Sequence, residues 1–420
     1  MSNTDSLPRV TFIGGGMITR IQLLPAIYHL QRQGVVGEIH VNALNAAPLI
    51  ELREDEMLKK AFPGQSFTPW PDPDKVDPDE KFPELYKEVL AAAPKGSIAV
   101  IAVPDNLHYT MLDEAIKNDL HVLIVKPLVL KYSQAEEIAQ RAYEKGLVVG
   151  VEYHKRFDDR NLMARQLYRR GKFGNFRLAQ AQMIEPYYYR DSNFQNWCIC
   201  ENSDMFTYVG CHYVDLVAFI TGLKPVSVSV YGIVDEYPNG NKGYLWTDAR
   251  VIWENGASLS IVDAIGYPNA APGGNYQGLV MWCQGDKDAT LLVHNDQFRG
   301  VKHSYNFADP GGKIYSEPSP DYFQMVYRGG DGLTPVGYGY RSVEYIIRAC
   351  CKARAMSDLK ERQKFLKQLD SDGIMATPAN SSYNELVIEA GRKSIQAGGR
   401  EVLIDYDGEP RIRFREYEDK

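Results

Sequence analysis

Short apolar runs alternate with amphipathic stretches over residues 9–150, and this rhythm leaves few folds open to the chain. It is typical of a parallel sheet whose strands are joined by crossover helices. The expected strands are Arg9–Ile13, Glu38–Leu44, Ser97–Val103, His121–Val125 and Leu147–Val151. The expected helices are Met17–Leu30, Pro48–Ala61, Phe82–Ala93, Leu107–Asn118 and Ser133–Lys145. The proline-rich and acidic residues 69–79 are expected to form a surface loop.

The first expected strand runs directly into a glycine-rich turn at residues 14–19, with the sequence Gly-Gly-Gly-Met-Ile-Thr. Glycines allow a sharp turn and a close approach to a pyrophosphate, and the helix that follows offers N–H groups to the phosphates. The match to G-x-G-x-x-G is incomplete, because Thr19 stands at the third glycine position. The context of strand, turn and helix still predicts a dinucleotide site. Cofactor contacts are expected from Gly14, Gly16, Met17 and Ile18.

The end of the second expected strand bears on the choice of cofactor, because residues 41–45 lack the acidic residue that usually binds the adenosine ribose. Asn45, just beyond the core of this strand, could hydrogen-bond the ribose hydroxyls instead. No arginine follows immediately to hold a 2′-phosphate. The sequence therefore favours NAD and leaves NADP open.

After about residue 175 the pattern changes to strands with few helices between them, which predicts an α+β domain with a large, open, mainly antiparallel sheet. The expected strands are Phe176–Met183, Pro225–Asp235, Leu245–Trp253, Ala257–Ala264, Gly278–Gln284 and Ala289–Val293. Helices are expected at Ser342–Ala355, Leu359–Leu369 and Ser381–Ala397. Several strands carry apolar residues in both alternation phases, so we expect a homodimer or homotetramer packed through the sheet.

Charge and composition disfavour several classes of partner and site. The net charge of −7 over 420 residues argues against nucleic acid and anionic membranes as partners. The sequence shows neither a run of about 18 apolar residues nor a signal-peptide pattern, so a cytoplasmic location is expected. The six cysteines lack metal-ligand spacing and are expected to be reduced thiols. His108, His154 and His212 also lack a metal-site spacing, so no metal is expected.

Three further segments resemble the motifs of one enzyme family. Val103–His108 resembles a T-P-N-x-x-H turn, Val125–Pro127 resembles E-K-P, and Gly210–Asp215 resembles D-x-G-x-H-x-x-D. In this order and at this spacing the chain is similar to the Gfo/Idh/MocA family of sugar and polyol oxidoreductases. Two positions depart from the motifs. Val125 replaces the glutamate before Lys-Pro, and Tyr208 replaces the aspartate before the motif histidine.

The resemblance implies a division into two domains. A Rossmann domain over residues 1–150 would be completed by a segment near 381–405, and residues 151–380 would form a substrate-binding and oligomerisation domain. The resemblance also implies NAD(P) as cofactor and a sugar, cyclitol or glycoside as substrate. Further cofactor contacts are implied at Val103, Asn106, His108 and Lys126.

Oxidation of a secondary alcohol needs a hydride acceptor, a base for the hydroxyl proton and a donor to the developing carbonyl. Lys126 follows a strand end, where open α/β sheets hold ligands, and Pro127 restricts its backbone. Tyr208, His212 and Asp215 fall at i, i+4 and i+7 on one helical face, where the carboxylate could orient the histidine. We assign catalysis to Lys126, His212 and Tyr208. Substrate contacts are expected from these three residues and from Tyr153, His154, Tyr188 and Trp197.

The expected function is an NAD(P)-dependent oxidoreductase that oxidises a secondary hydroxyl of a sugar, cyclitol or glycoside. A second hypothesis continues from the ketone with elimination of a glycosidic substituent, addition of water and return of the hydride, so that no net NADH forms. Tyr208 motivates it, because the site then has spare proton carriers. A third hypothesis is a non-catalytic nucleotide-binding sensor with the same fold.

Overall fold

The structure is a computed structural model that describes residues 7–269, 271, 274–295, 304–306, 314–316 and 321–416. The chain divides into two compact units. The first holds the chain up to Val129 together with Ser133–His154 and Phe323–Asn380, and the second holds Leu130–Tyr132, Lys155–Tyr322 and the chain from Ser381 onward. No helix among the described residues is both long and apolar enough to cross a membrane. None of the six cysteines, all of them described, forms a disulfide.

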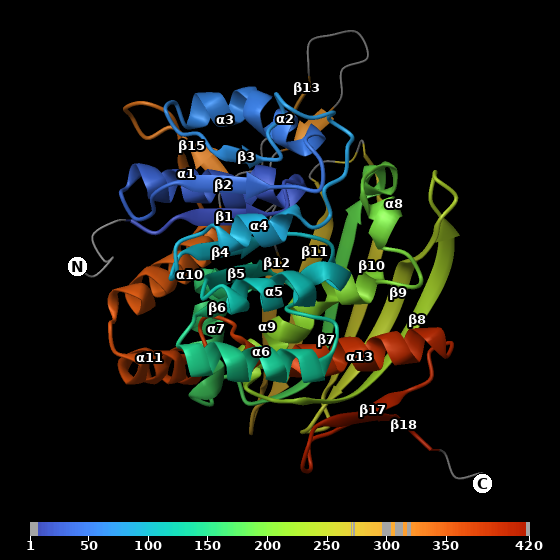
Figure 1. Ribbon diagram of the computed structural model, residues 1–420. Coiled ribbons are helices and arrows are strands. Elements are labelled where there is room, and N and C mark those ends of the chain that lie inside the picture. Colours follow the sequence, from blue (N-terminus) through green and yellow to red (C-terminus); the bar gives the residue numbers. More distant parts are fainter. Residues whose placement is uncertain are drawn as a thin grey trace. The chain divides into compact units, whose positions relative to one another are not determined.

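Six strands of the first unit form one parallel sheet (Figure 1): β1 (Val10–Ile13), β2 (Ile39–Asn42), β3 (Thr68–Trp70), β4 (Ile98–Ile101), β5 (His121–Val125) and β6 (Val149–Glu152). Their order is β3-β2-β1-β4-β5-β6. In the central strand, Val10 lies opposite Ile39 on one side and Ile98 on the other. This is the strand order of a dinucleotide-binding Rossmann sheet, so the expected α/β class is confirmed.

One strand differs from the expectation. The sequence predicts a loop over residues 69–79, but Thr68–Trp70 forms β3 and pairs with β2. Pro69 is tolerated because β3 is an edge strand, where one side of the backbone needs no partner strand.

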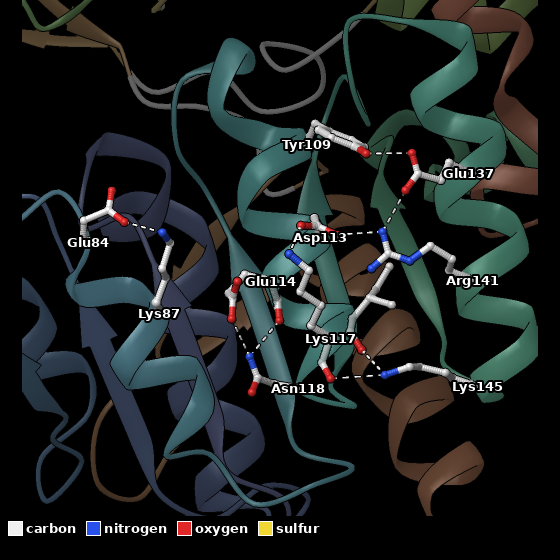
Figure 2. Close-up of polar contacts among 11 residues, drawn as sticks. Glu84, Lys87, Tyr109, Asp113, Glu114, Lys117, Asn118, Glu137, Arg141 and Lys145 are labelled. Atoms are coloured by element: carbon white, nitrogen blue, oxygen red, sulfur yellow. Dashed lines mark hydrogen bonds and ion pairs between the residues drawn. The ribbon is translucent and has the colours of Figure 1, made fainter.

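Helices cover both faces of the Rossmann sheet. The helices α4 (Leu85–Ala91) and α5 (His108–Lys117) pack on one face, and α6 (Tyr132–Lys145) lies beside α5. Figure 2 shows the polar contacts between α5 and α6: Tyr109 donates to Glu137 at 2.7 Å, and Arg141 pairs with Asp113 at 2.7 Å. The Arg141–Asp113 ion pair is half-buried, with 26% and 21% of its side chains exposed. Ion pairs near the surface contribute about 0–1 kcal/mol each, so these contacts link the two helices but add little stability.

On the other face, α10 (Tyr338–Ala355) packs against β5, β6 and α1 (Leu24–Arg32), which follows the π-helical turn η1 (Thr19–Leu23). The helix expected over residues 48–61 is broken at Asp55, whose carboxylate accepts from the N–H of Leu58 at 2.9 Å and caps the second piece. Further elements of this part of the chain are α2 (Ala47–Glu54), α3 (Glu56–Ala61), η2 (Asp105–Leu107), η3 (His154–Phe157), β15 (Gln324–Val326), β16 (Thr334–Val336), α11 (Leu359–Asp372) and α12 (Pro378–Ser381).

The second unit is built on an eight-stranded mixed sheet. Its strands are β7 (Asn175–Pro186), β8 (Pro225–Glu236), β9 (Lys242–Trp253), β10 (Ser258–Tyr267), β11 (Tyr276–Gln284), β12 (Ala289–Asn295), β17 (Val402–Asp405) and β18 (Arg411–Phe414). Their order is β12-β11-β7-β10-β9-β8-β17-β18. The β7–β10 pair is parallel and the other neighbours are antiparallel. The expected large, mainly antiparallel sheet is therefore confirmed. A short pair, β13 (Ser304–Asn306) and β14 (Ile314–Ser316), is separate from it.

Helices cover one face of this sheet, and the other face is open in the single chain. The covering helices are α7 (Asp159–Arg169), the π-helical turn η5 (Phe206–Gly210), α9 (Cys211–Thr221) and α13 (Tyr383–Gln396). Leu245 and Ile261 are buried beneath them. On the open face Tyr231, Val262 and Leu291 are 59%, 46% and 58% exposed. The sequence predicts that both faces of this sheet are buried. Within a single chain, one face is buried and the other is exposed.

The structure corrects the expected domain boundaries. Residues 323–380, expected in the substrate domain, belong to the first unit, where α10 packs on the Rossmann sheet. Residues 381–405, expected to complete the Rossmann domain, belong to the second unit. There α13 packs on β8, and Leu403 pairs with Ser227 of β8. The pairing of strands distant in sequence decides this division, which is why the order along the chain did not reveal it.

Candidate active site

Gly14 closes the turn after β1 in a conformation and a space that suit glycine alone. Its φ of 111° lies in the left-handed region. A Cβ on Gly14 would lie 2.1 Å from the carbonyl oxygen of Ala102, just beyond β4. Thr19 donates its hydroxyl to the carbonyl oxygen of Gly14 at 2.7 Å. Thr19, which stands at the third glycine position of the motif, therefore stabilises the turn.

Gly16 borders open space at the beginning of the helix. Apart from its own neighbours in the chain, no heavy atom lies within 4 Å of the position of a Cβ there. Helical structure begins at Met17, and the first N–H groups of a helix have no acceptor within it. This end of the helix therefore offers donors and room to an anion. The residues fit a dinucleotide pyrophosphate, and the contacts expected from Gly16, Met17 and Ile18 stay predictions.

Exposed apolar side chains follow three strand ends of the Rossmann sheet. Met17, Leu44 and Leu107, after β1, β2 and β4, are 39%, 51% and 39% exposed. At the carboxyl edge of a parallel sheet such side chains offer a surface to nucleotide rings. Asn42 is buried and donates to the carbonyl oxygen of Trp70 at 3.1 Å. Asn45 is half-buried and stays the candidate amide for the ribose.

His108 connects the loops after β4 and β5. It is fully buried, and its Nδ1 lies 2.6 Å from the carbonyl oxygen of Pro127 and its Nε2 3.0 Å from that of Val103. Both ring nitrogens therefore face backbone carbonyl oxygens, so His108 positions the loop that carries Lys126. The expected cofactor contact of His108 stays a prediction. Lys126 and Val103 are half-buried and Asn106 is exposed, so these three stay candidates for ligand contacts.

Tyr153 and His154, both expected to contact substrate, lie in the first unit. Tyr153 is 1% exposed, and its expected substrate contact stays a prediction. His154 keeps 10% of its side chain exposed, and its Nδ1 lies 3.1 Å from Oε2 of Glu152. His154 therefore stays a candidate, with a carboxylate partner that the sequence analysis did not assign.

Tyr208 and His212 lie one turn apart on a helix of the second unit, where η5 continues into α9. Tyr208 is half-buried and His212 is buried. Asp204, one turn earlier, accepts from the N–H of Thr207 at 2.8 Å and pairs with Arg392 at 2.9 Å, so it caps the helix. A π-helical turn widens the helix and is frequent at functional sites.

Asp215 is bound by groups other than His212, contrary to the expectation. Its carboxylate accepts from Nε and Nη2 of Arg156 at 2.8 and 2.5 Å. It also accepts from Tyr383 at 3.1 Å and from Asn384 at 3.0 Å. Burial, and next the charge of Asp215, raise the pKa of Tyr383 well above its ordinary value, so its hydroxyl stays a donor. Asp215 therefore belongs to a buried structural network.

Aromatic rings gather around Tyr208. The ring centroids of Phe194 and Trp197 lie 4.8 and 5.5 Å from that of Tyr208. Tyr189 stacks on Phe194 at 5.0 Å, and Tyr188 meets Tyr189 edge-on at 5.0 Å. The rings come from η4 (Tyr187–Asp191) and α8 (Phe194–Trp197). The structure thus brings together Tyr188, Trp197 and Tyr208, and flat rings beside hydroxyls suit carbohydrate.

The sequence analysis missed a buried polar cluster in the second unit. Lys155 donates to Gln277 at 2.7 Å, Gln277 donates to Asn275 at 3.0 Å, and Asn275 donates to Glu185 at 3.2 Å. Asp263 on β10 is fully buried. Glu185, Gln277 and Asp263 occupy inward strand positions, where alternation predicts apolar residues, and this mismatch was the available clue. Within the described part of the chain, no group of three or more His, Cys, Asp or Glu side chains is arranged to hold a metal ion.

A Rossmann sheet with a glycine turn after its first strand defines the class of a dinucleotide-binding domain. Residues 8–153 match the Gfo/Idh/MocA model, described as an oxidoreductase family with an NAD-binding Rossmann fold. This match confirms, over residues 8–153, the resemblance to the Gfo/Idh/MocA oxidoreductases that was drawn from the motifs.

Several curated proteins are similar to parts of the chain. UDP-N-acetylglucosamine 3-dehydrogenase of Acidithiobacillus ferrooxidans is 25% identical over 146 residues, which are 35% of this chain and 42% of that protein. D-glucoside 3-dehydrogenase of Escherichia coli is 21% identical over 228 residues, 53% of this chain and 56% of that protein. The chain thus spans about half the length of these relatives.

Solved structures share the fold over almost the whole chain. GenD2 from gentamicin A biosynthesis, in complex with NAD, gives a TM-score of 0.62 at 17% identity and covers 96% of this chain and 98% of its own. Scyllo-inositol dehydrogenase from Lactobacillus casei, with bound NAD(H) and scyllo-inositol, gives a TM-score of 0.59 at 17% identity. The match covers 95% of this chain and 99% of that chain. At this identity the likeness shows the fold.

Proposed function

We propose that this chain is an NAD-dependent oxidoreductase that oxidises a secondary hydroxyl of a sugar, cyclitol or glycoside. The observation that carries the proposal is the arrangement of residues at the carboxyl edge of the family-matched sheet. Gly14 lies against Ala102. His108 contacts the backbone carbonyls of Val103 and Pro127 and so joins the loops after β4 and β5. Lys126 is the residue between the end of β5 and Pro127. Open α/β sheets hold their ligands at this edge.

In the proposed reaction, bound NAD supplies the hydride acceptor. Lys126 and His212 together handle the proton of the substrate hydroxyl, and the lysine ammonium also stabilises negative charge on that oxygen. Tyr208 binds the same hydroxyl or relays its proton. The rings of Tyr188 and Trp197 beside Tyr208 offer flat faces to the substrate.

The names of the relatives support the substrate class. UDP-N-acetylglucosamine 3-dehydrogenase and D-glucoside 3-dehydrogenase act on sugar derivatives, and a further relative, scyllo-inositol 2-dehydrogenase (NAD(+)) of Bacillus subtilis, is 24% identical over 164 residues. We therefore expect a panel of sugars, cyclitols and glycosides to contain a substrate that yields NADH. Turnover of simple aldehydes or amino acids, with no carbohydrate oxidised, would contradict the proposed class.

We expect purified protein to bind NADH more tightly than NADPH. No arginine directly follows Asn45, which lies three residues beyond β2, to pair with a 2′-phosphate. Titration with each nucleotide, followed by the fluorescence of the reduced nicotinamide, measures both affinities. Tighter binding of NADPH would contradict the expected preference for NADH. If neither nucleotide bound, the assignment as an oxidoreductase would be refuted. Binding without turnover of any substrate would favour the sensor hypothesis.

A second candidate function is redox-assisted glycoside cleavage. It is favoured by the half-buried Tyr208, where the family motif has aspartate, and by His154 with its carboxylate partner. The ketone formed by oxidation makes the neighbouring C–H acidic, so the glycosidic substituent can be eliminated. Water then adds, and the hydride returns to the substrate.

We expect the cofactor balance with a glycoside to separate the two functions. Stoichiometric NADH with the glycosidic bond intact is expected for the dehydrogenase. Aglycone released without net NADH, and only when NAD is present, would instead establish cleavage. Tyr208→Phe removes the hydroxyl and keeps the ring, so unchanged turnover in both assays would reduce Tyr208 to a packing role.

We further propose a homodimer or homotetramer packed through the open face of the eight-stranded sheet. This face carries exposed Tyr231, Val262 and Leu291. Asp248 and Arg250, two residues apart on β9, point to the same face. A two-fold related copy could therefore bring opposite charges together over an apolar surface.

Light scattering at micromolar concentration is expected to give a multiple of the chain mass of 47.4 kDa. Val262→Asp should lower this mass, because a charge on the apolar face opposes burial. Met163→Asp is the matched control, since Met163 is 60% exposed on α7 and away from the sheet. A monomeric mass for the unchanged protein would refute the interface.

A further inference from the structure

A buried hydrogen-bond network lies at the carboxyl end of β6, within the first unit. Glu152, the last residue of β6, is 3% exposed. Its Oε1 accepts from Nε2 of Gln22 at 2.8 Å and from the hydroxyl of Ser342 at 2.6 Å. Gln22 and Ser342 are both fully buried, and both also face the carbonyl oxygen of Gly339. The carboxylate of Glu152 is therefore held from two different helices.

The other oxygen of Glu152 is directed at a histidine. Oε2 lies 3.1 Å from Nδ1 of His154. The ring of Tyr338 stacks on the imidazole at 5.7 Å between centroids, with 23° between the planes. An ionised carboxylate only accepts hydrogen bonds, so Nδ1 must carry the hydrogen, and a neutral ring then keeps its lone pair on Nε2.

The network lies at the same carboxyl edge of the sheet as Lys126. In the sheet register Glu152 lies directly opposite Val125, the residue before Lys126. Paired residues on neighbouring strands point to the same face of the sheet. The family motif has glutamate at the position of Val125. In this chain the carboxylate on that face comes from Glu152 of the neighbouring strand.

We propose that Glu152 is a positioning residue that fixes His154 with its proton on Nδ1, so that Nε2 accepts a proton from a substrate hydroxyl. The identity of the substrate rests on the proposed function. The geometry of the Glu152–His154 pair is independent of it. Gln22 and Ser342 hold the carboxylate, and Tyr338 holds the plane of the ring. The chain thereby gains a proton acceptor on the same unit as Lys126, in addition to His212 on the other unit.

The first test reads the tautomer directly, on the full chain without cofactor or substrate. Histidine labelled with ¹⁵N is observed by long-range ¹H–¹⁵N correlation at a pH where the ring of His154 is neutral, and His154→Gln assigns its signals. We expect the unchanged protein to carry the proton on Nδ1. In Glu152→Gln the new amide donates to Nδ1, so the proton should move to Nε2.

Two outcomes of this test would overturn the proposal: a proton on Nε2 in the unchanged protein, or the same tautomer in Glu152→Gln. Asp370→Asn is the matched control, because Asp370 is a partly buried carboxylate of the same unit whose described partner is Thr377, at 2.6 Å. It should leave the tautomer of His154 unchanged. If Glu152→Gln does not fold, Glu152→Asp sets the carboxylate back by one methylene, and an unchanged fraction of the Nδ1–H form would contradict the proposal.

The second test separates positioning from a merely structural role. Glu152→Gln should lower kcat by about 10²-fold, because a histidine in the wrong tautomer loses most of its acid–base function. It should leave NADH affinity unchanged. In the His154→Gln background Glu152→Gln should cost nothing more, since Glu152 acts through His154. Additive losses would refute the coupling, whereas failure of every substrate would count against the proposed function and leave the tautomer result standing.

Discussion

Replacing Lys126 by alanine is expected to lower kcat by about 10²- to 10⁴-fold, the usual contribution of a positioned acid or base. The side chain follows β5 on a loop that His108 holds through the carbonyl oxygen of Pro127. In the proposed reaction its ammonium acts mainly on the transition state, so KM should change much less than kcat. The measurement is NADH formation at saturating NAD with the best carbohydrate of the panel.

Lys131→Ala provides the matched control, because Lys131 is an exposed lysine a few residues further along the chain. It should retain the kcat of the unchanged enzyme. NADH titration of both variants separates a loss of chemistry from a loss of cofactor binding. If Lys126→Ala kept more than about a tenth of kcat, the lysine would have to be removed from the mechanism.

Gly14→Ala is expected to destabilise the first unit by about 3 kcal/mol or more and to abolish NADH binding. At a φ of 111°, a Cβ would lie 2.1 Å from the carbonyl oxygen of Ala102. That oxygen belongs to backbone directly beyond the buried strand β4, which cannot move aside without disturbing the sheet. Thermal unfolding followed by NADH titration measures both effects.

Gly16→Ala makes the same chemical change two residues away, where a Cβ would meet no heavy atom within 4 Å beyond the local chain. Stability should therefore change by no more than about 0.5 kcal/mol. NADH affinity should still fall, because the methyl group occupies room that we assign to the pyrophosphate. Equal destabilisation by both alanines would contradict the role of Gly14. Full NADH affinity in Gly16→Ala would place the pyrophosphate elsewhere.

The Rossmann architecture could be predicted because its evidence is local. Period-two and helical patterns mark the strands and helices of residues 9–150, and the turn after the first strand needs glycine for its positive φ. Strand β5 was predicted with its observed bounds, His121–Val125. The break at Asp55 and the edge strand β3 were not predicted. A capping side chain and an edge position depend on what surrounds the segment.

The site was predicted less completely than the fold. The positions of Lys126, Tyr208 and His212 followed from motif resemblance, and the rings near Tyr208 from a loop rich in aromatic residues. Their roles stay proposals, as do the cofactor contacts at the glycine turn. Spacing suggested that Asp215 would orient His212, but Arg156 holds that carboxylate from 59 residues away. A buried carboxylate pairs with the strongest donor within reach, and helical spacing does not reveal which donor that is.

The sequence by itself determined the alternation of strands and helices, the glycine turn and the strand-end position of Lys126, because each depends on a few consecutive residues. The tertiary structure alone decided that residues 323–380 join the first unit and that the chain from Ser381 joins the second. It also decided that Glu152 lies opposite Val125 and faces His154. Strand order and buried hydrogen bonds depend on which residues are close in space. The separation of two residues along the chain does not predict whether they are close in space.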